Sequence, residues 1–259
     1  MADSILSAQV VINDGSVVTA SSTQNSDLFR ALKGAGANSF GIVTQLTFQA
    51  YDVSQPVTYF EYHFSKAAQF QALKAYQIWG VNATPEVSAS LDQNPSGGNR
   101  FYGVFLGPQS NLQSEVQTYL SNVPPPTSTY IVQTDYIHSA VITAGFNIST
   151  DPSVLNLQNG YVYRENPGDG WVHRDALFNI QMKAYWTNQP QNTLTETDFV
   201  EGIWNAVRPY SSSQAYQNYI DVEEPLSAYY ANNLNSLIAT KKKWDSTNVF
   251  NFNQSIPLE

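Results

Sequence analysis

The order of strand and helix signals from residue 57 onward restricts the possible folds more than any other feature of this sequence. A strand at 57–64 is followed by a helix, then by strands around 86–91 and 101–106, and then by a helix at 111–123. Strand–helix–strand–strand–helix–strand is the order of a ferredoxin-like unit, in which helices cover one face of an antiparallel sheet. The sequence therefore predicts an α+β fold that contains such a unit.

The two helices of this unit carry signals that place them. Ser65 precedes the first helix as an N-cap, and the three prolines at 124–126 end the second helix. The apolar face predicted for the first helix comprises Ala67, Phe70, Leu73 and Ile78. We expect that face to pack on the sheet.

The residues before this unit predict a hairpin, a short helix and a strand. Residues 8–20 contain two β-branched runs joined by Asn-Asp-Gly, a strong tight-turn signal. A helix at 26–33 ends in the glycine-rich loop 34–41, and residues 42–48 alternate like a strand with one buried face. Because the glycines precede a strand, they do not form a dinucleotide fingerprint. The loop is then either a helix stop with a tight turn or backbone that lies close to a flat ligand.

The C-terminal half predicts further elements. Residues 175–186 resemble a long strand, 197–207 a helix that starts from a capping box, and 215–221 a short strand or extended segment. The last helix is expected from Pro225 to about residue 243. It ends in the lysine run 241–243, where cations interact favourably with the helix dipole.

Composition excludes several classes of function. The sequence contains 12 Lys and Arg residues and 21 Asp and Glu residues. The resulting net charge of -9 disfavours nucleic acid and anionic membranes as partners. We find no apolar run of the roughly 20 residues that span a bilayer and no secretory signal, so the compartment stays unknown. With no Cys and three scattered His, we expect no disulfide and no metal site. An aromatic content of 13% favours a ring-lined cleft for a small molecule.

Two short segments contain candidate proton-transfer residues. His173 begins the run His-Arg-Asp, which is either a solvated turn with a local ion pair or an imidazole in a cleft that exchanges protons. The run 216–221, Tyr-Gln-Asn-Tyr-Ile-Asp, is either packing at the rim of a sheet or the location of a tyrosine base. No serine nucleophile elbow or phosphate loop is present.

Three segments, taken in order, resemble the berberine bridge enzyme-like FAD-linked oxidases of the vanillyl-alcohol oxidase superfamily. Residues 2–48 resemble the end of that family's flavin-binding domain. Residues 171–186, which begin Trp-Val-His-Arg-Asp, resemble a strand of its substrate domain. Residues 216–257, which begin Tyr-Gln-Asn-Tyr-Ile-Asp, resemble the C-terminal segment that returns to the flavin domain.

The resemblance implies three parts and a cofactor. Residues 1–54 would be a remnant of the FAD-binding domain, 55–212 the ferredoxin-like substrate domain, and 213–259 the returning segment. The implied cofactor is FAD. Members of the family carry a long flavin-binding region ahead of the part that this chain resembles, with the pyrophosphate loop and a histidine bonded to the ring. We therefore expect flavin oxidation by this chain alone to fail, and a preceding region or a separate chain to supply the other half of the flavin site.

The resemblance also implies roles for single residues. Tyr219 matches the position where carbohydrate oxidases of this group place a tyrosine base, which takes a proton from a substrate hydroxyl while the flavin takes hydride. Asn218 and Ile42 match residues that lie against the flavin ring and the adenine side. A catalytic Glu that precedes the His-Arg motif in relatives corresponds to Glu165 or Asp169.

Three functions stay open at this point. The first is an FAD-linked oxidoreductase acting on a small organic or natural-product substrate. The second is a flavin-independent cyclase or isomerase of secondary metabolism, whose catalysis would rest on proximity and a few hydrogen bonds. The third is a non-catalytic module that binds a small molecule.

Overall fold

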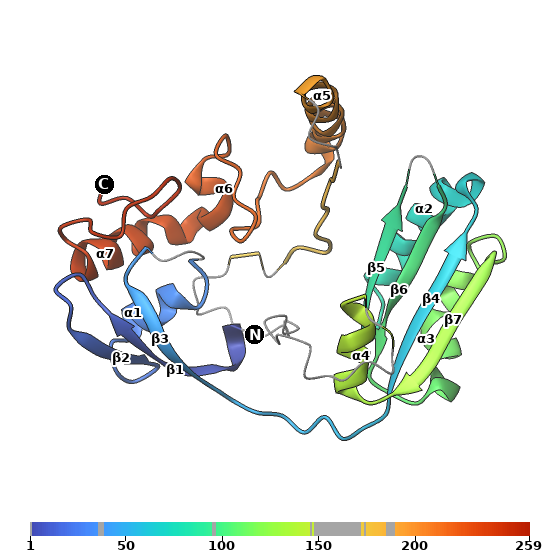
Figure 1. Ribbon diagram of the computed structural model, residues 1–259, viewed down its shortest axis with the longest axis horizontal. Helices are drawn as coiled ribbons and strands as arrows, with labels where there is room; N and C mark the ends of the chain where they lie inside the picture. The colour runs from blue at the N-terminus through green and yellow to red at the C-terminus, as the bar shows by residue number, and fades with distance from the viewer. Residues whose placement is uncertain are drawn as a thin grey trace. The chain divides into compact units, whose positions relative to one another are not determined.

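The computed structural model describes residues 2–35, 39–94, 97–145, 147, 172–173, 175–184 and 190–259, and for 190–196 the backbone only. The chain forms two compact units (Figure 1). One unit comprises Met1–Ala50 with Gly160–Glu259, and the other comprises Tyr51–Asn159. The three parts suggested by the resemblance, with boundaries at residues 54 and 212, stay a prediction.

The ferredoxin-like order is confirmed in residues 51–159. The unit contains, in chain order, β4 (Val57–Phe64), a 3-10 turn (Lys66–Ala68), α2 (Gln69–Gly80), β5 (Val87–Gln93), β6 (Asn99–Phe105), α3 (Gln109–Leu120), β7 (Ser128–Thr134) and α4 (Tyr136–Thr143). Its strands pair antiparallel in the order β5-β6-β4-β7. The predicted α+β class therefore holds.

Helices pack on both faces of this sheet. Phe60 and Phe101 lie on the face that packs against α2 and α3, where Trp79 and Tyr119 complete an aromatic core. Figure 1 shows α2 and α3 behind the sheet and α4 in front of it. Helix α4, which the sequence did not predict, covers part of the opposite face: Tyr136 and Ile142 pack with Val57, Tyr59 and Val104.

The apolar face predicted for α2 is wrong. Phe70 is 76% exposed, and Leu73 and Ile78 are also exposed, as is Ala67 before the helix. The buried stripe consists of Ala68, Ala72, Ala75 and Trp79, which recur with helical spacing. Three small alanines let the helix approach a sheet face crowded with rings, and the single large Trp79 fills the remaining space.

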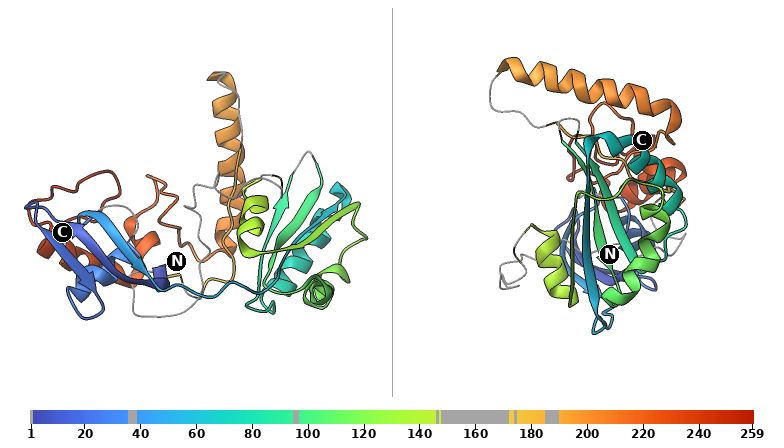
Figure 2. Two further views of the ribbon diagram at one scale, coloured as in Figure 1. Left: turned by 60° about the horizontal axis from the view of Figure 1, so that its bottom comes forward. Right: turned by 90° about the vertical axis from the view of Figure 1, so that its right-hand side faces the viewer.

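The other unit contains a three-stranded antiparallel sheet in the order β2-β1-β3. Its elements are η1 (Ala2–Ser4), β1 (Ile5–Val11), β2 (Val17–Ser21), α1 (Ser26–Leu32), β3 (Ile42–Phe48), α5 (Pro190–Val207), η4 (Arg208–Tyr210), α6 (Leu226–Tyr230), η5 (Ala231–Asn233) and α7 (Leu234–Trp244). The predicted hairpin is confirmed, and Gly15 takes the left-handed conformation (φ +82°) that its tight turn requires. Figure 2 shows α5 as one straight helix.

The C-terminal helices pack on the N-terminal hairpin and helix. Ala8, Val10 and Leu28 form one core with Leu237 and Ile256. The carboxylate of Asp27 in α1 accepts hydrogen bonds from Lys243 Nζ at 2.7 Å and from Trp244 Nε1 at 3.1 Å. Segments more than 200 residues apart in sequence therefore form one folded body.

Two strand predictions in this unit need correction. Strand β3 forms as predicted but has no buried face: only Val43 is partly buried, because the core lies under β1 and β2 and does not extend beneath β3. Residues 175–184 form no strand, and Leu177 and Ile180 are more than 60% exposed. A strand requires a neighbour that takes its backbone hydrogen bonds, and no ladder to this described segment is formed.

Three further expectations for the C-terminal half change. Residues 215–221 form no strand, and a turn at 217–218 interrupts the segment. Helix α5 begins at Pro190, before the proposed capping box, with proline in the first helical position, where it is well tolerated. The last helix forms but is interrupted at Ala231, whose φ of +42° separates α6 from α7.

Candidate functional site

The candidate site is built on a turn that presents Tyr219. The backbone N–H of Tyr219 donates to the carbonyl of Tyr216 at 2.9 Å, and the two rings lie 5.6 Å apart. Asn218 Nδ2 donates to the hydroxyl of Tyr216 at 2.8 Å. Tyr219 is 65% exposed. The residue therefore lies at the surface, where another molecule can reach it.

The residue between Asn218 and Tyr216 fixes this turn to the glycine-rich loop. Gln217 is buried, and its Nε2 donates to the carbonyl of Gly34 at 2.9 Å. The next carbonyl, that of Ala35, accepts from the hydroxyl of buried Tyr230 at 2.7 Å. Burial raises the pKa of Tyr230 to about 12, so this hydroxyl stays protonated and acts as a donor.

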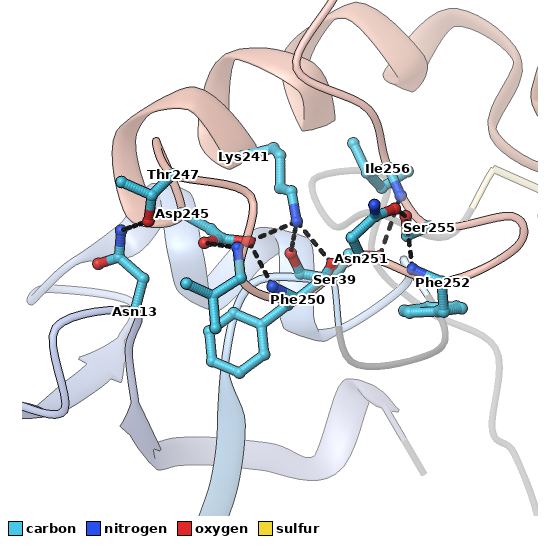
Figure 3. A network of polar contacts seen from close by, with 11 residues as sticks. Asn13, Ser39, Lys241, Asp245, Thr247, Phe250, Asn251, Phe252, Ser255 and Ile256 are labelled. Carbon is cyan, nitrogen blue, oxygen red and sulfur yellow. Dashed lines mark hydrogen bonds and ion pairs between the residues drawn. The ribbon is translucent and has the colours of Figure 1, made fainter.

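A buried ion pair holds the far end of the same loop (Figure 3). Lys241 and Asp245 are both fully buried, and Lys241 Nζ lies 2.6 Å from Asp245 Oδ2. The ammonium also donates to the carbonyls of Ser39 at 2.8 Å and Phe250 at 2.7 Å, so its three protons are all used. The hydroxyl of Ser39 in turn accepts from the N–H of Ile256 at 3.1 Å.

The electrostatics of this pair favour the charged state of the carboxylate. Burial raises the pKa of Asp245, but hydrogen bonds from Lys241 and from the N–H groups of Phe250 and Val249 outweigh that effect. The pKa of Asp245 is therefore held below its ordinary value.

Where the loop joins strand β3, its backbone lies in close contact with β1. Gly41 has a φ of +157°, and a Cβ on it would lie 2.6 Å from the carbonyl oxygen of Val11 and 2.7 Å from a methyl group of Val10. Only glycine fits this close approach to β1. The following residue, Ile42, is about half exposed.

Of the predicted catalytic residues, His173 lies near the turn and Glu165 cannot be placed. His173 Nδ1 is 2.9 Å from Gln214 Oε1. Because the amide oxygen can only accept, Nδ1 carries the proton of that bond, and in the neutral ring Nε2 is the proton acceptor. Glu165 and the alternative Asp169 lie outside the described residues. The roles of Tyr219, His173, Asn218 and Ile42 stay predictions.

Sequence reasoning missed the residues that hold the loop, Lys241 above all. The lysine run was interpreted only as cations that interact favourably with the helix dipole, but Lys241 is fully buried while Lys242 and Lys243 are exposed. A signal was present: Lys241 follows Leu237 by four residues and precedes Trp244 by three, so it lies on the apolar face of α7, and Asp245 follows at i+4.

The described residues can be tested against the expected cofactor. Ile42 and Tyr219 are both exposed, and Gln217 joins the turn of Tyr219 to Gly34 in the loop that precedes Ile42. An exposed apolar side chain and an exposed phenol are compatible with contacts to a flat ring system. Across the described ranges, no group of three or more His, Asp or Glu is arranged to hold a metal ion. In the same residues, no helix has both the length and the apolarity to cross a bilayer.

The amino-acid sequence matches a known family at its C-terminal end. The sequence model "Berberine and berberine like" matches residues 215–257, which include the Tyr219 turn, α6 and α7. Curated relatives extend the similarity over nearly the whole chain. "Chitooligosaccharide oxidase" of Gibberella zeae is 24% identical over 98% of this chain and 63% of its own length. "Uncharacterized FAD-linked oxidoreductase YgaK" of Bacillus subtilis is 26% identical over 98% of this chain and 65% of its own length.

A solved structure gives a stronger similarity. Wild-type BBE-like 1 of Physcomitrella patens is 37% identical, with a TM-score of 0.91 over 100% of this chain and 66% of that protein. The chain thus spans somewhat less than two thirds of the length of the relatives that it matches.

Proposed function

Because this chain belongs to the berberine bridge enzyme-like FAD-linked oxidoreductases, we propose that it forms the Tyr219-bearing part of such an enzyme and acts on a small organic substrate that carries a hydroxyl group. One observation carries the proposal: the family similarity covers the whole chain, and the matched tyrosine is exposed on a turn fixed to the glycine-rich loop. The name of the oligosaccharide-oxidising relative supports a hydroxyl-bearing substrate.

In this proposal, each residue of the chain has a limited task. Tyr219 takes the proton of the substrate hydroxyl, for which its own hydroxyl must be accessible. Asn218 holds the ring of Tyr216 beside that of Tyr219, and this contact orients the ring of Tyr219. Ile42 offers an apolar contact to one side of the ring system. A bound FAD would supply the hydride acceptor that oxidation of the substrate carbon requires.

We further propose that the region of the relatives that this chain does not match completes the flavin site, either in the same polypeptide or as a separate chain. The exposed edge of β3 supports this. Ile42, Leu46 and Phe48 each expose more than 40% of their surface along an edge strand. Unpaired edges and grouped apolar side chains are typical of surfaces that another segment covers.

The test is an oxidation assay. The chain is combined with FAD and with the region of Physcomitrella patens BBE-like 1 that precedes the similar part, and oxygen uptake is measured with oligosaccharides and other hydroxyl-bearing compounds. We expect oxygen uptake with at least one substrate class. The Tyr219→Phe variant should fold normally and lose about 10²-fold or more in turnover, the usual contribution of a general base.

Other outcomes would contradict the proposal. An unchanged rate in Tyr219→Phe would remove this residue from the reaction. Conversion of a substrate without oxygen uptake and without FAD would instead support a cyclase or isomerase. Binding without any turnover would support a small-molecule binding module.

A further inference from the structure

In the described part of the glycine-rich loop, three backbone carbonyls accept hydrogen bonds from side chains of the C-terminal segment. Gln217 donates to the carbonyl of Gly34, Tyr230 to that of Ala35, and Lys241 to that of Ser39, at 2.7–2.9 Å. The partners are between 183 and 202 residues apart in sequence. We call Gln217, Tyr230 and Lys241 the clasp. All its members are buried and belong to one compact unit.

Stability alone is a weak explanation for the ion pair at Lys241. Replacing a buried ion pair by apolar residues of similar size is often neutral or stabilising, because desolvation of the two charges offsets their attraction. The contacts of Lys241 do constrain geometry. Lys241 lies in contact with three acceptors from three places in the chain, namely Ser39, Asp245 and Phe250 (Figure 3).

The clasp connects the two segments that carry the candidate site residues. At one end, Gln217 lies inside the turn that presents Tyr219. At the other end, Lys241 binds the carbonyl of Ser39, two residues before Gly41. Gly41 lies in close contact with β1 and directly precedes Ile42. Movement of the loop would therefore shift Ile42 and Tyr219 relative to one another.

We propose that Gln217, Tyr230 and Lys241 are positioning residues, which act through the carbonyl groups of Gly34, Ala35 and Ser39 to fix Tyr219 relative to Ile42. The functional meaning of that distance rests on the proposed function. The positioning itself needs neither flavin nor substrate, so the two can fail separately.

The test uses amide hydrogen exchange of the full chain, read by mass spectrometry. Gln217→Met and Tyr230→Phe each remove one donor with little change in volume. Thr240→Val is the matched control, because Thr240 is also a buried residue of α7, but its hydroxyl donates to the carbonyl of Ser236 within the helix. We expect exchange in peptides covering 39–48 and 216–222 to rise about tenfold in both clasp variants, as loss of one buried hydrogen bond implies. Thr240→Val should leave both peptides unchanged.

A second readout reports on Tyr219 directly. In protein labelled with 3-fluorotyrosine, the ¹⁹F resonance that disappears in Tyr219→Phe belongs to Tyr219. We expect that resonance to shift or broaden in Gln217→Met and to keep its position in Thr240→Val. Exchange that rises uniformly over the unit, or an unchanged resonance of Tyr219 in Gln217→Met, would show that these residues only stabilise the fold and would overturn the proposal.

Discussion

Lys241 and Asp245 are two opposite charges buried inside the unit formed by Met1–Ala50 and Gly160–Glu259. Each charge is compensated by the other. A buried charge that loses its partner typically costs about 3–5 kcal/mol. The pKa of Asp245 is depressed in the folded chain, so its carboxylate contributes stability above its unfolded pKa of about 3.9. This contribution is lost as the pH falls through the folded pKa.

The first prediction follows from the lowered pKa of Asp245. Asp245→Asn should lower the free energy of unfolding at pH 7 by about 3 kcal/mol or more. The difference from the unchanged protein should shrink as the pH falls below about 4, because the unfolded chain then takes up a proton at Asp245, whereas the folded chain, in which the pKa of Asp245 is lowered, does so only at a lower pH. Urea denaturation at pH 3, 5 and 7 measures it. Asp52→Asn is the control, since Asp52 is an exposed linker carboxylate with a local hydrogen bond to the N–H of Ser54. A constant difference at all three pH values would contradict this account.

Helix α2 shows how an element can be placed correctly and oriented wrongly. Its buried stripe is mostly alanine, whereas Phe70, Leu73 and Ile78 are exposed. Trp79 contributes most to its packing: the ring lies 5.0 Å from that of Phe101, and Nε1 donates to the carbonyl of Glu115 at 2.8 Å.

Two substitutions test which face of α2 contributes to stability. Trp79→Ala should lower the free energy of unfolding by about 3–5 kcal/mol, the usual loss for a buried large aromatic residue. Phe70→Ser should change it by no more than about 0.5 kcal/mol, because the ring is largely in solvent. Chemical denaturation of both variants checks this. A larger effect at Phe70 than at Trp79 would restore the face that the sequence predicted.

Local signals predicted elements well, and the ferredoxin-like order followed from them. The hairpin depends on an Asn-Asp-Gly turn, and β4 on its own run of β-branched and aromatic residues, so each can be predicted from a few neighbouring residues. The exposure of β3 was not predictable in this way, because it depends on how far the core extends across the sheet. Likewise, nothing in the sequence around residues 175–184 shows whether a neighbouring strand is available.

At the scale of the whole molecule, the candidate site was predicted only in part. Resemblance to a family pointed to Tyr219, Asn218 and Ile42 as single positions. The clasp was not predictable, because its donors bind backbone carbonyls far away in sequence, and a carbonyl has no residue-type signature. Physical pattern reading could have found Lys241 on the apolar side of α7, but not what it binds.

The central claim is that this chain supplies one side of a flavin site and needs the remaining region of its relatives to retain FAD. The visible absorbance of the purified chain, after incubation with FAD and removal of free flavin, tests it most directly. We predict no flavin bands for the chain alone and clear bands once the preceding region of Physcomitrella patens BBE-like 1 is added. Flavin bands retained by the chain alone, or their absence in the combined sample, would contradict the claim.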